Sequence, residues 1–106
     1  MKETTRFVIE YAHCDAYGIV HNIEYVSWFE NRIAQSVYLQ AKNTLQPFVL
    51  TSVRSRFIHA LRWGDCIEMD TEVSWEDQRG EGKIVLRNEN KQGEISCICR
   101  FQVELQ

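Results

Sequence analysis

The sequence predicts an α+β fold in which one long helix is covered by a single antiparallel sheet of five strands. Apolar residues recur at helical spacing only within residues 22–43, whereas residues 6–11 and several segments after Pro47 read as strands. A helix with one wide apolar stripe needs one curved sheet to bury it. The 106 residues have room for one such core, so residues 1–106 are expected to form a single domain.

The first strand and the loop after it are predicted at residues 6–11 and 13–20. The sequence Arg-Phe-Val-Ile-Glu-Tyr is rich in β-branched and aromatic side chains, which favour strands. Residues 13–20 contain Asp15 and Gly18, which are typical of turns. The chain is therefore expected to leave a strand, turn around Asp15 and enter the helix directly.

The helix is predicted to begin at Asn22 and to end near residue 42 or 43. Asn22 is a good N-cap residue, and Glu24 in the first turn favours the positive end of the helix dipole. Pro47 follows the segment and prevents the helix from continuing. The apolar stripe contains Tyr25, Val26, Trp28, Phe29, Ile33, Ala34 and Val37.

Four further strands are predicted at residues 48–61, 66–75, 83–88 and 94–105, with turns at 77–80 and 90–93. Residues 66–75 and 94–105 alternate, which predicts one buried face for each strand. The expected buried residues are Ile67, Met69, Thr71, Val73, Trp75, Ile95, Cys97, Cys99, Phe101, Val103 and Leu105. Short turns between the strands predict antiparallel neighbours.

The composition excludes several classes of function. The formal net charge of −3 disfavours non-specific nucleic-acid binding, which needs a basic surface. No apolar run is long enough to span a membrane, and the polar start does not resemble a signal peptide, so a cytoplasmic protein is expected. Cys14, Cys66, Cys97 and Cys99 form no CxxC pair and are expected to be reduced and mostly buried.

Asp15 is the leading candidate for chemistry, because its carboxylate precedes the start of the predicted helix. The first N–H groups of a helix have no backbone acceptor and carry a partial positive charge, so they suit an oxyanion. A carboxylate that faces such donors across a bound carbonyl group can attack it or activate water. Gly18 would permit close backbone approach. The alternative, that Asp15 only caps a turn, stays open on the sequence alone.

The polar residues beside Asp15 allow further interpretations. His13, Cys14, Asp15 and His21 carry metal-binding atoms, but their spacing fits no zinc motif, so no metal or other cofactor is expected. Cys14 as a nucleophile with His13 or His21 as its base is a weaker alternative, because sequence neighbours point apart on an extended chain. His21 is a candidate general acid, a candidate substrate contact or simply a polar residue at the helix start.

Charged residues elsewhere have both structural and functional interpretations. Arg54 and Arg56 lie on one face of the strand predicted at residues 48–61, and Arg62 follows it. They are either an ordinary solvated face or contacts to a phosphorylated ligand, which guanidinium groups suit. Glu30 is expected to face solvent or to pair with Arg32 or Arg54.

Two segments together resemble a known family. Residues 15–30 read Asp-Ala-Tyr-Gly-Ile-Val-His-Asn-Ile-Glu-Tyr-Val-Ser-Trp-Phe-Glu, and residues 62–69 read Arg-Trp-Gly-Asp-Cys-Ile-Glu-Met. The first segment resembles the signature of the hotdog-fold acyl-CoA thioesterases, in their 4-hydroxybenzoyl-CoA thioesterase-like branch. The second is similar to that family's turn into its third strand. The resemblance covers nearly the whole chain.

The resemblance implies a hotdog fold, with a five-stranded antiparallel sheet wrapped around one long central helix. It implies edge-to-edge pairing of subunits in a homodimer or homotetramer, with the acyl group between subunits. Asp15 would be the nucleophile or general base, and the N–H of Asn22 would polarise the thioester carbonyl. Tyr11 matches a tyrosine near the aspartate in some members, and His21 is a further candidate catalytic residue. The residues expected to bind acyl-CoA are Gly18, Ser55, Arg56, Phe57 and His59, the last four from the partner subunit.

The implied function is hydrolysis of an acyl- or aroyl-CoA thioester to free acid and CoA. One alternative is an enoyl-CoA hydratase or dehydratase with Asp15 and His21 as its acid–base pair, although that family places the two residues one position closer. Another is a non-catalytic acyl-CoA-binding protein. The chain also departs from the pattern, since Tyr17 stands where many members carry glycine and the connection at residues 43–48 is shorter than usual.

Overall fold

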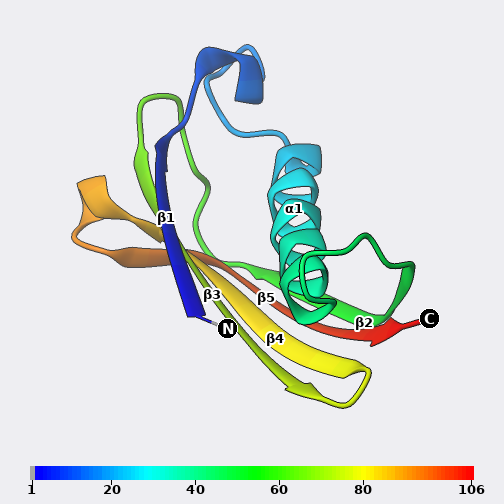
Figure 1. Cartoon of the computed structure of the whole chain (residues 1–106). Coiled ribbons are helices and arrows are strands. Elements are labelled where there is room, and N and C mark those ends of the chain that lie inside the picture. The colour runs from blue at the N-terminus through cyan, green and yellow to red at the C-terminus, as the bar shows by residue number, and fades with distance from the viewer. Residues whose placement is uncertain (1) are drawn as a thin grey trace.

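The computed structural model describes residues 2–106 as one helix packed against a five-stranded antiparallel sheet (Figure 1). This arrangement confirms the predicted α+β fold. The helix α1 spans Asn22–Gln40, and the strands are β1 (Lys2–Val8), β2 (Phe48–Phe57), β3 (Cys66–Glu76), β4 (Arg79–Asn88) and β5 (Glu94–Leu105). Two 3-10 turns, Tyr11–His13 and Glu89–Lys91, lie in the connections. No helix among residues 2–106 is long and apolar enough to cross a membrane.

The strand order in the sheet is β1-β3-β4-β5-β2, and every neighbouring pair is antiparallel. β2 therefore pairs with β5 and forms one edge, although β3 follows it in sequence. The prediction that short turns join all the later strands is wrong here, because residues 58–65 carry the chain across to β3. This crossing segment, residues 58–65, meets the loop after β1 at one end of the molecule (Figure 1).

The core lies between α1 and the face of the sheet that the helix covers. The buried residues of α1 are Tyr25, Phe29, Ile33, Ser36 and Val37. The prediction that Val26 and Ala34 belong to this stripe is wrong, because the stripe follows a spacing of three and four residues from Tyr25. That spacing leaves Ala34 exposed and Val26 45% exposed.

β1 and β2 both end earlier than predicted. β1 ends at Val8 rather than at residue 11, because Tyr11–His13 form a 3-10 turn. β2 ends at Phe57 rather than at residue 61, because the N–H groups of residues 58 and 59 both donate to the carbonyl oxygen of Ser96, at 2.8 and 3.1 Å. This shared acceptor ends the regular ladder and turns the chain out of the sheet.

α1 begins at the predicted residue, but its capping residue and its last residue differ from the prediction. Asn22 is the first helical residue, but the capping residue is His21, which makes no side-chain cap hydrogen bond. The helix ends at Gln40, because Lys42 and Asn43 adopt positive φ angles of 55° and 63°. Left-handed residues at this position close the last turn of a helix.

β4 begins at Arg79 rather than at residue 83, whereas β5 has the predicted bounds. Gly80 and Gly82 lie inside β4, not in a turn, because aromatic rings occupy the space where their side chains would be. A Cβ at Gly80 would come within 2.8 Å of the Trp75 ring, and one at Gly82 would overlap the Phe101 ring. These two glycines therefore serve packing.

Candidate active site

Asp15 lies in a tight turn that its own side chain holds closed. Its Oδ1 accepts hydrogen bonds from the N–H groups of Tyr17 at 2.8 Å and Ile19 at 3.1 Å. Its backbone N–H donates to the Ile19 carbonyl oxygen at 2.9 Å, and its carbonyl oxygen accepts the Gly18 N–H at 3.0 Å. Oδ2 makes no hydrogen bond with any of residues 2–106. One carboxylate oxygen of Asp15 therefore closes the turn, as the capping interpretation expects, and the other is available to a substrate or water.

Gly18 is required by its backbone conformation. Its φ angle is 75°, in the left-handed region that favours glycine. A Cβ there would meet nothing closer than the Cβ of Trp63, at 3.9 Å. The backbone conformation, and not a clash with a described residue, is therefore what favours glycine at this position.

The crossing segment holds the Asp15 turn in place. The N–H of Val20 donates to the carbonyl oxygen of Leu61 at 3.0 Å, and the N–H of Trp63 donates to that of Gly18 at 2.9 Å. An isolated antiparallel bridge also joins Ile19 to Arg62. These contacts fix both sides of the turn to a segment far away in the sequence, so the carboxylate is positioned by tertiary structure.

The helix start follows the turn without a break. The N–H of His21 donates to the carbonyl oxygen of His13 at 3.0 Å, and the carbonyl oxygen of His21 accepts the Glu24 N–H at 3.0 Å. The N–H groups of Asn22 and Ile23 open the helix and have no acceptor inside it. Because the cap residue makes no side-chain hydrogen bond, these two donors are not covered by a capping side chain.

Tyr25, in the first turn of α1, contacts the crossing segment and β2 beside the helix start. Its hydroxyl oxygen accepts the N–H of Leu61 at 3.3 Å, and its ring makes edge contacts with Trp28 and Phe57 at centroid distances of 5.5 and 5.1 Å. Burial raises the pKa of the Tyr25 hydroxyl. Tyr25 therefore ties the helix start, the crossing segment and β2 together, in its neutral form.

Cys14 and His13 do not form a nucleophile–base pair. The Cys14 Sγ donates to the carbonyl oxygen of Glu10 at 3.6 Å, and burial raises the pKa of this thiol. The Nδ1 of His13 accepts the Glu10 N–H at 3.0 Å, and its ring contacts the edge of Trp28. Both side chains are engaged in structure, and a thiol with a raised pKa is a poor nucleophile.

The other predicted site residues lie in different parts of the molecule. Tyr11 is 58% exposed and makes an edge contact with Trp63 beside the Asp15 turn. Ser55 and Phe57 lie on the face of β2 toward α1, opposite the buried residues Cys99 and Cys97 of β5. The structure does not bring the remaining two residues close to Asp15. Arg56 lies on the face of the sheet away from α1, and His59 Nε2 lies 3.3 Å from Glu94 Oε1.

Glu30 and Arg32 do not form the ion pair that the sequence allowed, because the Arg32 guanidinium bonds Glu3 Oε1 at 2.7 Å.

Among residues 2–106, no three His, Cys, Asp or Glu side chains come close enough together to hold a metal ion. Four surface hollows lie on or around the sheet, and Asp15 lines none of these four.

Comparison with solved structures identifies the architecture. Staphylococcus aureus DHNA-CoA thioesterase superposes with a TM-score of 0.78 at 17% identity, over 98% of this chain and 73% of that chain. The E. coli PaaI protein gives a TM-score of 0.78 at 14% identity, over 99% and 72%. A mutant 4-hydroxybenzoyl CoA thioesterase complexed with 4-hydroxybenzoyl CoA gives 0.76 at 14%, over 98% and 83%. The chain has the hotdog fold. No protein-family model and no curated protein sequence matches it.

Within this hotdog fold, sequence analysis missed two residues that build the site. Leu61, at 0% exposed, bonds both Val20 and Tyr25, and Tyr25 was assigned only to the apolar stripe. A usable signal existed for Tyr25, since a buried tyrosine usually has a partner for its hydroxyl group. No comparable signal marked Leu61, because its contribution comes from backbone groups.

Proposed function

We propose that the chain is an acyl-CoA thioesterase, which hydrolyses an acyl- or aroyl-CoA thioester to the free acid and CoA. The observation that carries the proposal is a hydrogen-bonded turn that leaves Oδ2 of Asp15 available, directly before a helix start whose cap makes no side-chain hydrogen bond. The fold supports it, since several solved structures that share the fold are named as thioesterases.

Two routes of attack use the same atoms. As a general base, Oδ2 of Asp15 takes a proton from water while the water oxygen bonds to the thioester carbonyl carbon. As a nucleophile, Oδ2 bonds to that carbon itself and water later hydrolyses the resulting anhydride. In both, the carbonyl oxygen gains negative charge and accepts a hydrogen bond from the N–H of Asn22. Collapse of the intermediate breaks the C–S bond, and CoA leaves as a thiolate that takes up a proton.

His21 and Tyr11 are substrate contacts in this proposal. Both side chains are exposed at the same end of the molecule as Asp15, one at the helix cap and one beside Trp63. His21 is also the candidate acid that would protonate the leaving thiolate. The alternative reaction, hydration of an enoyl-CoA, would also use His21. The product therefore distinguishes hydrolysis from hydration.

The site is completed by a second copy of the chain, paired along β2 in a homodimer or homotetramer. β2 is an edge strand, and an edge offers unpaired N–H and C=O groups to another strand. Its apolar residues Val53 and Phe57 are each 51% exposed, and Ile23 in the first turn of α1 is 70% exposed. Pairing would cover this apolar surface, and Ser55 of the partner subunit and Phe57 of the partner subunit would line the acyl pocket.

The decisive experiment is Asp15→Asn, assayed by thiol release from a panel of acyl- and aroyl-CoA substrates. Asparagine keeps an Oδ1 that can accept from Tyr17 and Ile19, so the turn survives while the carboxylate is lost. We expect turnover to fall by about 10²-fold to 10⁴-fold. Asp77→Asn, in the turn between β3 and β4, is the matched control and should keep full activity.

Three other results would contradict the proposal. Unchanged thiol release in Asp15→Asn would remove the role of the carboxylate. Consumption of an enoyl-CoA without thiol release by the wild type would establish hydration. Thermal stabilisation of the wild type by acyl-CoA, with neither reaction, would establish a binding protein.

A further inference from the structure

A row of three cations crosses the face of the sheet that points away from α1. Lys83 of β4 is the ladder partner of Arg100 of β5, and Arg100 is the ladder partner of Arg54 of β2. Direct cross-strand partners project from the same face of a sheet, with neighbouring strands about 5 Å apart. We call Lys83, Arg100 and Arg54 the cation row.

The cation row has one acid directly beside it, because Glu72 of β3 is the ladder partner of Lys83. Like charges directly opposite each other destabilise a sheet. None of the three side chains forms an ion pair with another residue in the range 2–106. The repulsion between them is therefore not relieved by an ion pair with any described residue.

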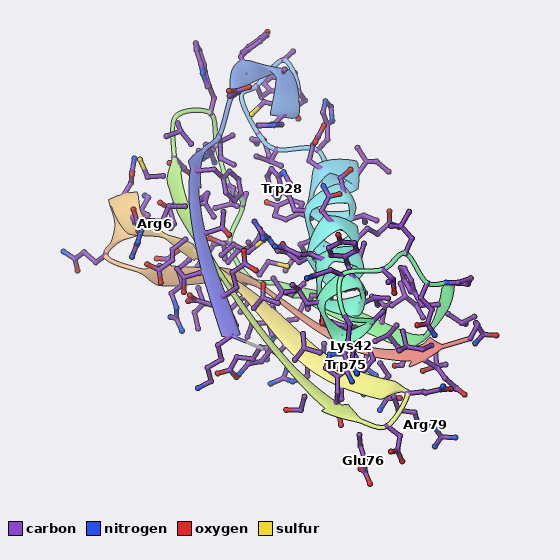
Figure 2. The ribbon with its side chains drawn as sticks, viewed as in Figure 1. Arg6, Trp28, Lys42, Trp75, Glu76 and Arg79 are labelled. Atoms are coloured by element: carbon purple, nitrogen blue, oxygen red, sulfur yellow. The ribbon has the colours of Figure 1, made fainter. Side chains whose placement is uncertain are left out.

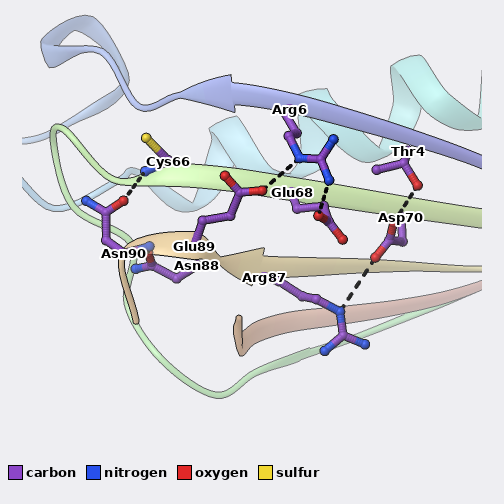
Figure 3. Close-up of polar contacts among 9 residues, drawn as sticks. All are labelled: Thr4, Arg6, Cys66, Glu68, Asp70, Arg87, Asn88, Glu89 and Asn90. Atoms are coloured by element: carbon purple, nitrogen blue, oxygen red, sulfur yellow. Dashed lines mark hydrogen bonds and ion pairs between the residues drawn. The ribbon is translucent and has the colours of Figure 1, made fainter. Parts of the chain in front are cut away.

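The acids of the neighbouring strand β3 are already engaged by other cations, and Figure 3 shows two of these contacts. The ion pairs are Glu72–Lys2 at 3.3 Å, Asp70–Arg87 at 3.5 Å and Glu68–Arg6 at 2.8 Å. Basic residues of β1 and β4 thus form ion pairs with these three acids of β3, and the cation row on β4, β5 and β2 forms none. The three cations outnumber the two acids beside them, Glu72 and Glu81, which leaves positive charge for an anion from outside the chain.

The cation row lines a shallow hollow of about 560 Å³ on this face. Hydrogen-bonding side chains complete it, among them Ser52 and Gln102. Two acids, Glu72 and Glu81, also line the hollow, and Glu72 is paired with Lys2. The hollow is therefore locally basic in a chain whose formal net charge is −3.

We propose that the cation row binds a ligand with two or more linked phosphate groups, such as a nucleoside diphosphate. Guanidinium groups bind phosphate oxygens in a bidentate way, and these bonds are among the stronger hydrogen bonds. The row spans two strand spacings, about 10 Å, which exceeds the reach of one phosphate group. It lies on the opposite face of the sheet from α1, so this inference does not depend on the thioesterase proposal.

The test compares thermal unfolding in sodium pyrophosphate and in sodium chloride at equal ionic strength. We expect pyrophosphate to raise the Tm of the wild type in a saturable way and its Kd for Arg100→Gln or Arg54→Gln to be at least about tenfold weaker. Without pyrophosphate, Arg100→Gln should have a Tm equal to or above that of the wild type, because it removes repulsion. That result also separates loss of binding from loss of folding.

Arg79→Gln is the matched control, because Arg79 lies on the same face of β4 but has two acids, Glu76 and Glu104, as its ladder partners. Figure 2 shows Arg79 and Glu76 together at the turn between β3 and β4. Arg79→Gln should bind pyrophosphate as the wild type does. Equal loss in Arg79→Gln and Arg100→Gln would show only non-specific attraction and would overturn the proposal.

Two more arms complete the experiment. ADP and CoA replace pyrophosphate to find the source of the diphosphate: a shift with ADP alone indicates a free nucleotide, and a shift with CoA that Arg100→Gln removes indicates the diphosphate of CoA. Absence of any shift in the wild type would overturn the proposal. So would an anion-independent change of solution mass in Arg100→Gln, which would make the row a contact between copies. Asp15→Asn should bind pyrophosphate unchanged, whatever its activity.

Discussion

The N–H of Leu61 donates a hydrogen bond to the hydroxyl oxygen of Tyr25 at 3.3 Å, inside the core. The carbonyl oxygen of the same leucine accepts the N–H of Val20 at 3.0 Å. One buried residue of the crossing segment is thus bonded on one side to α1 and on the other to the Asp15 loop. These two bonds connect the first turn of α1, the crossing segment and the end of the Asp15 turn.

Replacing Tyr25 by phenylalanine should destabilise the protein. The change leaves the buried N–H of Leu61 without its acceptor, which costs about 1–3 kcal/mol. Urea unfolding measures the difference. Tyr17→Phe is the control, because Tyr17 is 86% exposed and should lose almost nothing. If the two variants unfolded at the same urea concentration, the hydrogen bond between Leu61 and Tyr25 would not contribute to stability.

Gly18 should tolerate asparagine better than alanine. A residue with a Cβ at a φ angle of 75° is strained by about 1–2 kcal/mol, and asparagine tolerates this region better than other residues. We therefore expect the order of unfolding free energy to be wild type, Gly18→Asn, Gly18→Ala. Because space at this position is open, an equal loss in both variants would indicate a steric cause and contradict the conformational argument.

Thr71→Val should stabilise the protein by about 1 kcal/mol. The Oγ1 of Thr71 is buried on the α1 side of β3 and has no hydrogen-bond partner among the described residues. Valine keeps the shape and removes the unsatisfied hydroxyl group. Thr4→Val is the control, since the Thr4 Oγ1 donates to Asp70 at 2.7 Å and its loss should be neutral or unfavourable. A lower unfolding free energy for Thr71→Val would refute the assignment.

Alkaline pH should destabilise the fold through its buried thiols. Burial raises the pKa of Cys97 to about 12 and also raises the pKa values of Cys99 and Cys14. In the unfolded chain these thiols ionise near pH 8.5, so above about pH 9 the unfolded state has lost protons that the folded state retains. Stability therefore falls as pH rises, by up to about 1.4 kcal/mol per pH unit for each thiol.

Urea unfolding between about pH 8 and 11, in a reducing buffer, measures this slope. Cys97→Ala should be less stable at pH 8, because it leaves a cavity, and should lose stability less steeply above pH 9. Parallel pH profiles for Cys97→Ala and the wild type would show that Cys97 does not titrate as described.

The sequence predicted the elements whose pattern is local. The bounds of β5 and the first residue of α1 follow from alternation and from the change to helical spacing, because each depends on neighbouring residues only. Gly80 was misassigned to a turn, because its place against the Trp75 ring depends on packing across the sheet. The pairing of β2 with β5 was likewise invisible, since no local pattern encodes a partner strand.

The candidate site divides in the same way. Asp15, Gly18 and Asn22 belong to one short segment, so their association could be predicted from the amino-acid sequence alone. Arg54 and Arg56 do share a face, as predicted. A register shift between Leu50 and Ser52 decides which residues of β2 face α1, and no sequence pattern revealed it.

The position of β5 between β4 and β2 governs the order in which a newly made chain can fold. β1, β3 and β4 can pair as soon as they leave the ribosome, but within residues 2–106 β2 pairs with Glu94–Leu105, which is synthesised later. Until then, β2 lacks the strand that pairs with it in the sheet. Insertion of this late strand is a non-local event, and such events slow folding. A nascent chain stalled before residue 94 would therefore be a natural client for chaperones.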